Sequence, residues 1–453
     1  MNEILIYDGT IVNSSGCQQA DVLIKDGKIN LIQQNIEHNS NYKCIDAKGK
    51  YIIPGGIDPH VHFKLKTPAG YSADDFYTGS RAAIAGGTTS IIDFVTPEKD
   101  QSLIDALKIR LEDAKNCQCN YSFHMSPISW NDETANEMNK IKNAYGISSF
   151  KTYMAYKSSI GLDDIDLLNV MKQAAKLNAL VTIHAEDNDL IEKLRIDFVN
   201  EGKTSPKYHA LSRPAEAEAM AVGKAINMAI ETGASIYFVH ISAKESVKLI
   251  QNAQESGYPI YGETCPQYLL FDDSKLTDDF TSSAPFIFSP ALHDSSHKEI
   301  LWNALKNNTL QTVGTDHCPF NLKGQKDLGR HDFTKIPNGT GGVEHRIQLL
   351  YTYGVLKNKI TLEQWVAITS KNVSDIFNVK NKGQIKEGYD ADLVLFDPNN
   401  INKISVKSHH QNCDNNIYNN LEVHGKIEKV FIKGNLVFDN GILNTQKGTF
   451  ISH

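Results

Sequence analysis

The sequence lacks any long apolar run, and no stretch approaches the roughly 18 residues that a membrane-spanning helix requires. It also lacks an excess of positive charge, since 46 Lys and Arg residues against 53 Asp and Glu residues give a formal charge of −7. Nucleic-acid binding that depends mainly on electrostatic attraction is therefore not expected. The chain has few cysteines, and their number is odd. The seven residues are scattered along the sequence, so no disulfide framework is indicated. We expect a cytoplasmic protein that acts on a small soluble molecule, with no nucleic-acid or membrane partner.

The residues that are present indicate an ordinary globular protein, 41% hydrophobic and 22% charged. A length of 453 residues suits one α/β barrel of about 250 or more residues together with a smaller module. In the middle of the chain, apolar strands alternate with polar turns and amphipathic helices, which predicts a parallel (β/α)8 barrel of the TIM type. The predicted strands end near His62, Phe94, Ile128, Ala155, Glu186, Ser242, Glu263 and His317. The clearest predicted helices cover 74–85, 103–115, 165–177, 215–230 and 244–251.

Both ends of the chain differ from the middle. Near the N-terminus, Asp-Gly pairs at 8–9 and 26–27 follow short apolar runs. Asp-Gly favours a hairpin turn because glycine accepts positive φ without a steric cost. Near the C-terminus, 391–396 and 429–438 contain similar short strands. Neither end is large enough to bury a core alone, so we expect the two ends to pair with each other.

These patterns divide the chain into two domains. We predict that 1–52 and 380–453 form one small β-sandwich domain and that 53–379 form the barrel. The less regular stretch 272–292 is predicted to be a long functional loop.

A His-x-His pair closes the first predicted strand of the barrel. Residues i and i+2 of a strand point to the same face, so His60 and His62 can reach one metal ion. With 16 histidines in the chain, such a pair also arises by chance, and alone it is weak evidence.

Three further polar residues strengthen the metal-site hypothesis by their positions. His184, His240 and Asp316 each follow a different apolar strand. In an α/β barrel the C-terminal ends of the strands meet at one mouth, where such folds place their active sites. Histidines that merely satisfy hydrogen bonds at strand ends could explain one of these positions but not all of them together.

Lys151 lies in the fourth predicted strand, and its role has three readings. A protonated lysine has no lone pair and cannot bind a cation. It could instead be a Schiff-base nucleophile, a carbamate formed with carbon dioxide that bridges two metal ions, or a structural lysine whose head group reaches solvent. Four histidines and an aspartate exceed what one catalytic zinc normally uses, which favours the bridge.

With these residues in place, the chain resembles the amidohydrolase superfamily, and within it the dihydropyrimidinase/hydantoinase family of cyclic amide hydrolases. The resemblance covers nearly the whole length, and the motifs around Asp316 and Asn338 are the most discriminating. The matching motifs are Gly55-Gly56-Ile57-Asp58-Pro59-His60-Val61-His62, Gly86-Gly87-Thr88-Thr89, Ser149-Phe150-Lys151, His184-Ala185-Glu186, Ser212-Arg213-Pro214-Ala215-Glu216-Ala217, Glu263-Thr264-Cys265-Pro266-Gln267-Tyr268-Leu269, Thr315-Asp316-His317-Cys318-Pro319-Phe320 and Asp332-Phe333-Thr334-Lys335-Ile336-Pro337-Asn338-Gly339.

The resemblance implies a centre of two divalent metal ions. In such enzymes the residues that match His60, His62 and Asp316 bind the more buried ion, and those that match His184 and His240 bind the second. The lysine that matches Lys151 is carboxylated and bridges both ions. Zinc is the expected ion because imidazole and carboxylate ligands suit it, although manganese or cobalt could also occupy such a site.

The resemblance also implies a reaction, the hydrolysis of the cyclic amide bond of dihydropyrimidines or 5-substituted hydantoins to N-carbamoyl amino acids. A hydroxide that bridges the two metal ions attacks the ring carbonyl, and the tyrosine that matches Tyr156 stabilises the oxyanion. Asp316 carries the proton from the hydroxide to the departing nitrogen. Main-chain groups at Ser289 and Asn338 hold the ring amide. Members of this family are commonly homotetramers.

Two other functions remain open at this point. The nearest is allantoinase, which uses the same metal core on a ureido-substituted hydantoin, although the motif at 332–339 favours the dihydropyrimidinase branch. Dihydroorotase fits less well, because no arginine near the first strand matches the carboxylate of its substrate. The other is a non-catalytic dihydropyrimidinase-like interaction protein, against which the intact ligand set argues. Lys64 and Lys66 follow His62 and either favour a polar or anionic substituent of the substrate or face solvent.

Overall fold

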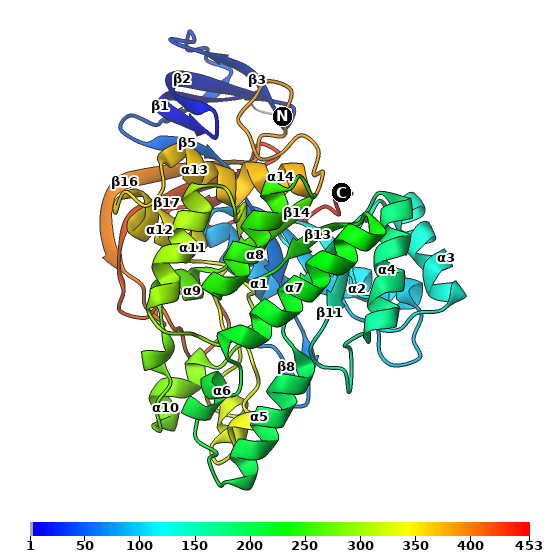
Figure 1. The fold of residues 1–453 in the computed structure, drawn as a ribbon. Helices are drawn as coiled ribbons and strands as arrows, with labels where there is room; N and C mark the ends of the chain where they lie inside the picture. Colours follow the sequence, from blue (N-terminus) through cyan, green and yellow to red (C-terminus); the bar gives the residue numbers. More distant parts are fainter. Residues whose placement is uncertain (1–2) are drawn as a thin grey trace.

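A computed structural model describes residues 3–453 of the chain (Figure 1). At its centre, eight parallel strands lie in the order β15-β14-β13-β12-β11-β10-β9-β6. The sheet nearly closes on itself where Val61 bridges His317 and the His62 N–H donates to the His317 carbonyl at 2.8 Å. The predicted (β/α)8 barrel is therefore confirmed. Its strands are β6 (Gly56–Val61), β9 (Thr88–Val95), β10 (Asn120–Met125), β11 (Ser149–Tyr153), β12 (Leu180–His184), β13 (Ser235–Phe238), β14 (Ile260–Thr264) and β15 (Thr312–Val313).

Helices alternate with these strands along the chain and have clear start and stop signals. The carboxylate of Asp75 caps α1 by accepting the Thr78 N–H at 2.8 Å. Helix α7 begins after Pro214 and ends before Gly233, whose φ of 70° is left-handed. No helix within 3–453 is both long and apolar enough to cross a membrane. The helices are α1 (Phe76–Ala85), α2 (Leu103–Asp113), α3 (Asp132–Lys140), α4 (Asp164–Leu177), α5 (Asn188–Asn200), α6 (Lys207–Leu211), α7 (Ala215–Thr232), α8 (Lys244–Glu255), α9 (Pro266–Leu270), α10 (Phe280–Ser283), α11 (Ser296–Lys306), α12 (Arg346–Leu350), α13 (Leu362–Val366) and α14 (Asn372–Ile376).

Three barrel strands end earlier than predicted. β10 ends before Ile128, β13 before Ser242 and β15 before His317. In β13 and β15 the extended backbone stops because it turns into the left-handed region shortly afterwards, with φ of 41° at His240 and 52° at Asp316. These two residues therefore lie just beyond their strands, at the mouth of the barrel.

The stretch 272–292 is more structured than the predicted loop. It contains α10 and two 3-10 turns, Asp273–Lys275 and Ala284–Phe286. Its apolar side chains pack against two residues of the segment that follows the last barrel strand, Phe333 and Ile336. This packing holds the two segments together beside the barrel mouth.

Strands from both ends of the chain form one mixed sheet of nine strands, in the order β19-β18-β17-β16-β5-β1-β2-β3 with β4 beside β1. β5 joins the two ends because it pairs in parallel with β1 and antiparallel with β16. In Figure 1 the blue N-terminal strands lie beside the orange β16. The exact division at residues 52 and 380 stays a prediction. The strands are β1 (Glu3–Asn13), β2 (Gly16–Lys25), β3 (Lys28–Gln33), β4 (Tyr42–Asp46), β5 (Tyr51–Pro54), β16 (Leu393–Lys403), β17 (Glu422–Ile432), β18 (Asn435–Asp439) and β19 (Ile442–Leu443); a separate two-stranded ribbon joins β7 (Lys66–Thr67) to β8 (Gly70–Tyr71).

The two faces of this sheet belong to different cores. Along β16, Leu393 and Leu395 lie in a small cluster made by the sheet itself. Val394 and Phe396, between and after them, lie in the large cluster that also contains the barrel helices. Because successive strand residues point to opposite faces, one face of the sheet packs on the barrel and the other encloses its own core. This arrangement fixes the sheet to the side of the barrel.

Candidate active site

Two histidines at the end of the first barrel strand meet an aspartate that follows the last strand. The Nε2 atoms of His60 and His62 lie 3.1 and 3.0 Å from the same carboxylate oxygen of Asp316. One ligand atom of each residue lies within 4.8 Å of those of the other two. Two imidazoles and a carboxylate at this spacing fit a divalent cation. The three residues therefore form a candidate metal-binding group.

His184 and His240 form a second pair on the adjacent side of the mouth. His184 Nδ1 and His240 Nε2 face each other at 2.9 Å, and His240 Nδ1 has no hydrogen-bond partner in the described part of the chain. Burial lowers the pKa of both imidazoles, so that both are neutral near pH 7. Two neutral imidazoles can each offer a lone pair to the same ion. This donor set also fits a metal.

Two buried carboxylates orient these histidines. Glu263 Oε1 lies 2.7 Å from His60 Nδ1, and Glu186 Oε2 lies 2.7 Å from His184 Nε2. A carboxylate on one ring nitrogen fixes the tautomer and leaves the other nitrogen free for a metal. Neither carboxylate was among the predicted site residues. Glu263, at a predicted strand end, met the criterion that selected Asp316, and Glu186 is in the i+2 position from His184.

The contact between His60 and Glu263 gives a pH-dependent prediction for the metal-free protein. Burial lowers the pKa of His60, but Glu263 and Asp316 outweigh this effect and raise it from 6.5 to about 9. The folded-state pKa is the higher one, so the stabilisation is complete below about pH 6.5 and is lost as the pH rises through about 9. We expect Glu263→Gln to lower the Tm of chelator-treated protein by a few degrees at pH 6.5. This difference from the wild type should shrink toward pH 9, and a constant difference would contradict the assignment.

Lys151 lies between the two groups of histidines. Its side chain is 1% exposed, and its Nζ is 5.0 Å from the ring centroids of both Phe94 and Tyr153. The ring centroid of Phe94 lies 4.6 Å from that of His62, and the ring centroid of Tyr153 lies 6.0 Å from that of His184. Burial lowers the pKa of the Lys151 amine to about 7. An amine that is partly neutral near pH 7 therefore lies beside both candidate ligand sets, which does not fit a lysine that extends to solvent.

Tyr156 lies in the loop after β11 and has a left-handed φ of 62°. The guanidinium of Arg213 lies 5.5 Å from the Tyr156 ring centroid, and its Nη2 donates to the Tyr156 hydroxyl at 3.5 Å. The same arginine forms a buried ion pair with Glu186, which contacts His184. Tyr156, like His240 and Asp316, thus has a left-handed backbone conformation, which is rare for residues other than glycine, and lies at the barrel mouth. Such backbone conformations are often found at functional sites.

Ser289 and Asn338 lie on two segments that meet beside the last strand. The Gly339 N–H donates to the Ile287 carbonyl at 3.0 Å. Asn338 is exposed, whereas Ser289 is buried and its hydroxyl has no hydrogen-bond partner among residues 3–453. The segment of Asn338 continues into Thr340, whose carbonyl accepts the N–H of Cys318 at 2.8 Å, just after Asp316. Both predicted backbone positions are therefore brought to the rim that carries the metal-binding group.

Lys64 and Lys66 are paired with carboxylates outside the predicted ligand set. Lys64 Nζ lies 2.5 Å from Asp113, and Lys66 Nζ lies 3.0 Å from Glu98. The side chains of Lys66 and Glu98 are largely exposed to solvent. These contacts favour the solvent-facing reading of the two lysines over a preference for an anionic substrate.

A second group of residues with metal-binding side chains involves Glu344, His345 and His409. Its ligand atoms already have partners: His345 Nε2 accepts the Asn416 amide at 2.8 Å, and His410 donates to both carboxylate oxygens of Glu344. These contacts join the connection between β16 and β17 to the barrel. We therefore interpret this group as a structural hydrogen-bond network.

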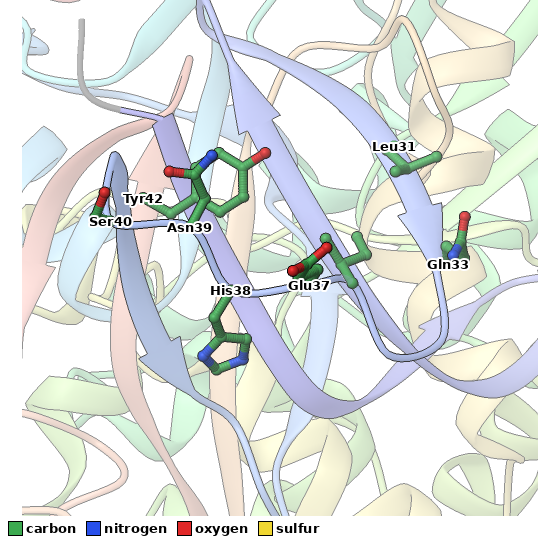
Figure 2. Close-up of a pocket in the computed structure, with 8 residues that line it drawn as sticks. Leu31, Gln33, Glu37, His38, Asn39, Ser40 and Tyr42 are labelled. Carbon is green, nitrogen blue, oxygen red and sulfur yellow. The ribbon is translucent and has the colours of Figure 1, made fainter.

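The N-terminal sheet has a surface hollow of about 570 Å³, lined by residues of β3, β4 and their connection (Figure 2). Figure 2 shows that its labelled side chains, among them His38, Asn39 and Tyr42, all come from this sheet region. None of the predicted site residues lines it. The candidate active site is therefore the mouth of the barrel.

Comparison with known proteins identifies the family to which this barrel belongs. The amidohydrolase family model matches residues 51–437. A D-hydantoinase from Geobacillus stearothermophilus is 42% identical over 96% of this chain and 92% of its own length. A dihydropyrimidinase from Arabidopsis thaliana is 37% identical over 96% of this chain and 82% of its own length. The crystal structure of a dihydropyrimidinase from Brevibacillus agri superposes with a TM-score of 0.98 at 42% identity, covering 99% of this chain and 98% of that one.

A barrel of this kind, with a cluster of histidines and an aspartate at its mouth, is typical of metal-dependent hydrolases. The chain belongs to the dihydropyrimidinase/D-hydantoinase family of the amidohydrolases, as the sequence motifs predicted. Members of this family are cyclic amide hydrolases, so the chain is an enzyme of that type with a small cyclic substrate.

Proposed function

We propose that this enzyme opens the ring of dihydropyrimidines or 5-substituted hydantoins by hydrolysing the amide bond, and that the product is an N-carbamoyl amino acid. One observation carries the proposal: two pairs of histidines, Asp316 and a buried lysine converge at the barrel mouth of a chain that is 42% identical to a D-hydantoinase. This donor set offers what metal-assisted hydrolysis requires, and none of its residue types is missing.

We propose that His60, His62 and Asp316 hold one divalent ion and that His184 and His240 hold a second. Carboxylation of Lys151 would give a carboxylate able to bridge them, and the depressed pKa of its amine supports this modification. Zinc is the proposed ion, because neutral imidazoles and carboxylates suit it. When bound, two such ions make a hydroxide available near neutral pH. The buried carboxylates behind His60 and His184 keep both rings oriented for this role.

The remaining residues act on the substrate. The Tyr156 hydroxyl donates to the carbonyl oxygen as negative charge develops on it, and Arg213 holds the hydroxyl in place. Asp316 takes the proton of the attacking nucleophile and delivers it to the departing ring nitrogen. Backbone N–H and C=O groups at Ser289 and Asn338 bind the amide edge of the planar ring.

Replacing Tyr156 with phenylalanine is expected to lower kcat by about 10²–10³-fold, because one hydrogen-bond donor to the developing oxyanion is lost. KM should change much less, since this bond is stronger in the transition state than in the ground state. Steady-state kinetics and metal analysis of the purified variant test this prediction. Tyr258→Phe, at an exposed tyrosine, is the matched control, and a Tyr156→Phe enzyme with wild-type kcat would remove Tyr156 from this role.

A substrate panel tests the proposed function as a whole. The chelated protein is reloaded with zinc or manganese and assayed with dihydrouracil, phenylhydantoin, carboxyalkyl hydantoins and allantoin. We expect ring opening of the first two with either metal. Preference for allantoin would make the enzyme an allantoinase. Stable protein that binds no metal and opens no ring would identify a non-catalytic interaction protein.

Two further expectations belong to the proposal. All seven cysteines are free thiols, which supports a reducing, cytoplasmic location. The family resemblance supports a homotetramer, and light scattering of the purified protein tests this assembly.

A further inference from the structure

Lys326 is a buried lysine to which the proposed reaction assigns no role. It begins a 3-10 turn, Lys326–Gly329, in the segment after the last barrel strand, and its side chain is fully buried. Its Nζ donates to the carbonyl oxygens of Ile287 at 3.1 Å and Pro337 at 3.0 Å. Burial lowers the pKa of this amine to about 7, opposed only weakly by the neighbouring thiols Cys413 and Cys318. Within residues 3–453, the Lys326 amine therefore makes hydrogen bonds to two backbone carbonyls and forms no ion pair.

The two carbonyls belong to the segments that carry the proposed ring-binding positions. Ile287 lies two residues before Ser289, and Pro337 directly precedes Asn338. On the other side of Asn338, the Gly339 N–H donates to the same Ile287 carbonyl at 3.0 Å. The backbone on both sides of Asn338 is therefore tied to the Ile287 segment, once through Lys326 and once directly.

The local backbone leaves little room for another arrangement. Gly339 has a φ of 143°, and a Cβ at this position would lie 2.2 Å from the Cys318 carbonyl oxygen. On one side this segment thus packs closely against Cys318, two residues after Asp316, and on the other side Lys326 holds it. Without the amine, the Ile287 carbonyl would keep the Gly339 N–H as a donor, but the Pro337 carbonyl would lose its bond to Lys326. Because a carbonyl without a donor away from water is unfavourable, removing the amine would favour separation of the two segments, with water entering between them.

We propose that Lys326 is a positioning residue for substrate binding, which sets the spacing between the backbone groups of Ser289 and Asn338 without touching the substrate. The inference rests on the proposed function, because it assumes that these two positions hold the ring amide. Hydrogen bonds from a rigid backbone to the ring are made in the ground state and in the transition state alike, so their loss raises KM with little effect on kcat.

The test replaces Lys326 with methionine, an unbranched side chain one atom shorter than lysine, which removes the amine and both of its hydrogen bonds. Its matched control is Lys335→Met, at a lysine whose side chain is 70% exposed and which lies in the same segment beside Asp332. We expect Lys326→Met to raise KM for dihydrouracil about tenfold, with kcat within about threefold of the wild type and unchanged metal content. The control should match the wild type in all three quantities.

The outcomes separate the two hypotheses. Wild-type enzyme that opens no cyclic ureide defeats the proposed function, whatever the variants do. Active wild type with an unchanged KM in Lys326→Met overturns the positioning role, as does a loss of kcat and Tm at constant KM, which defines a merely structural lysine. If Lys326→Met does not fold, Lys326→Gln, which retains an N–H donor, takes its place. A KM raised about threefold at constant kcat then supports the role, and an unchanged KM overturns it.

Discussion

Lys151→Ala is expected to yield folded protein that has lost its metal and its activity. The amine of Lys151 is buried between the two groups of histidines, and its pKa is lowered to about 7 by burial. A substantial fraction is thus neutral near pH 7 and able to react with carbon dioxide. Alanine cannot form the carboxylate that this reaction would supply, so the proposed bridging ligand would be missing. We expect kcat/KM to fall by more than about a thousandfold, which corresponds to about 4 kcal/mol of transition-state stabilisation.

Metal analysis and steady-state kinetics check this prediction, and the cavity left by the side chain allows a rescue experiment. A short carboxylic acid such as acetate or propionate can enter that cavity and replace the missing carboxylate. We expect added acid to restore part of the metal content and activity of Lys151→Ala. Lys157→Ala, in the following loop where the lysine lies 3.7 Å from Asp189, is the control without effect. Full metal content in Lys151→Ala without added acid would rule out the bridging role.

The sequence predicted the barrel well because each strand combines an apolar run with a polar end. The pair His60 and His62 was visible because a strand repeats every two residues. His240 and Asp316 were found as candidates because each follows an apolar run. Both residues follow the strand in a left-handed conformation, which an apolar pattern does not reveal.

The residues that orient the site were harder to predict because their contacts join distant parts of the chain. Glu263 contacts His60 across 203 positions, and Lys326 reaches Ile287 across 39. A lysine in a polar stretch such as Gly324-Gln325-Lys326 gives no sign of burial, and only the packing of the two rim segments places it under the surface. The candidate ligands can be recognised from the apolar run that precedes each of them. The residues that orient the site can be recognised only from contacts in the folded structure.

Asp316→Asn is expected to keep the fold and much of the metal but to lose turnover. Asparagine has nearly the same size, and its side-chain oxygen can still face His60 and His62, which lie about 3 Å from the aspartate. Burial raises the pKa of Asp316, but these two histidines outweigh it and hold the pKa well below its usual value. The native side chain is therefore a carboxylate at neutral pH, able to accept a proton, which an amide cannot do.

General acid–base catalysis typically contributes about 10²–10⁴-fold to a rate, so we expect kcat of Asp316→Asn to fall by this factor. Metal content and circular dichroism should stay close to wild type, because the loss is one of proton transfer and not of structure. Asp375→Asn, at an exposed aspartate that pairs with Lys371 on the outside of the barrel, should leave kcat unchanged. Near-normal turnover of metal-loaded Asp316→Asn would show that another group carries the proton. Glu263 and Glu186 would be poor substitutes, because they contact His60 Nδ1 and His184 Nε2, and the nitrogens proposed to bind metal are the opposite ones of these rings.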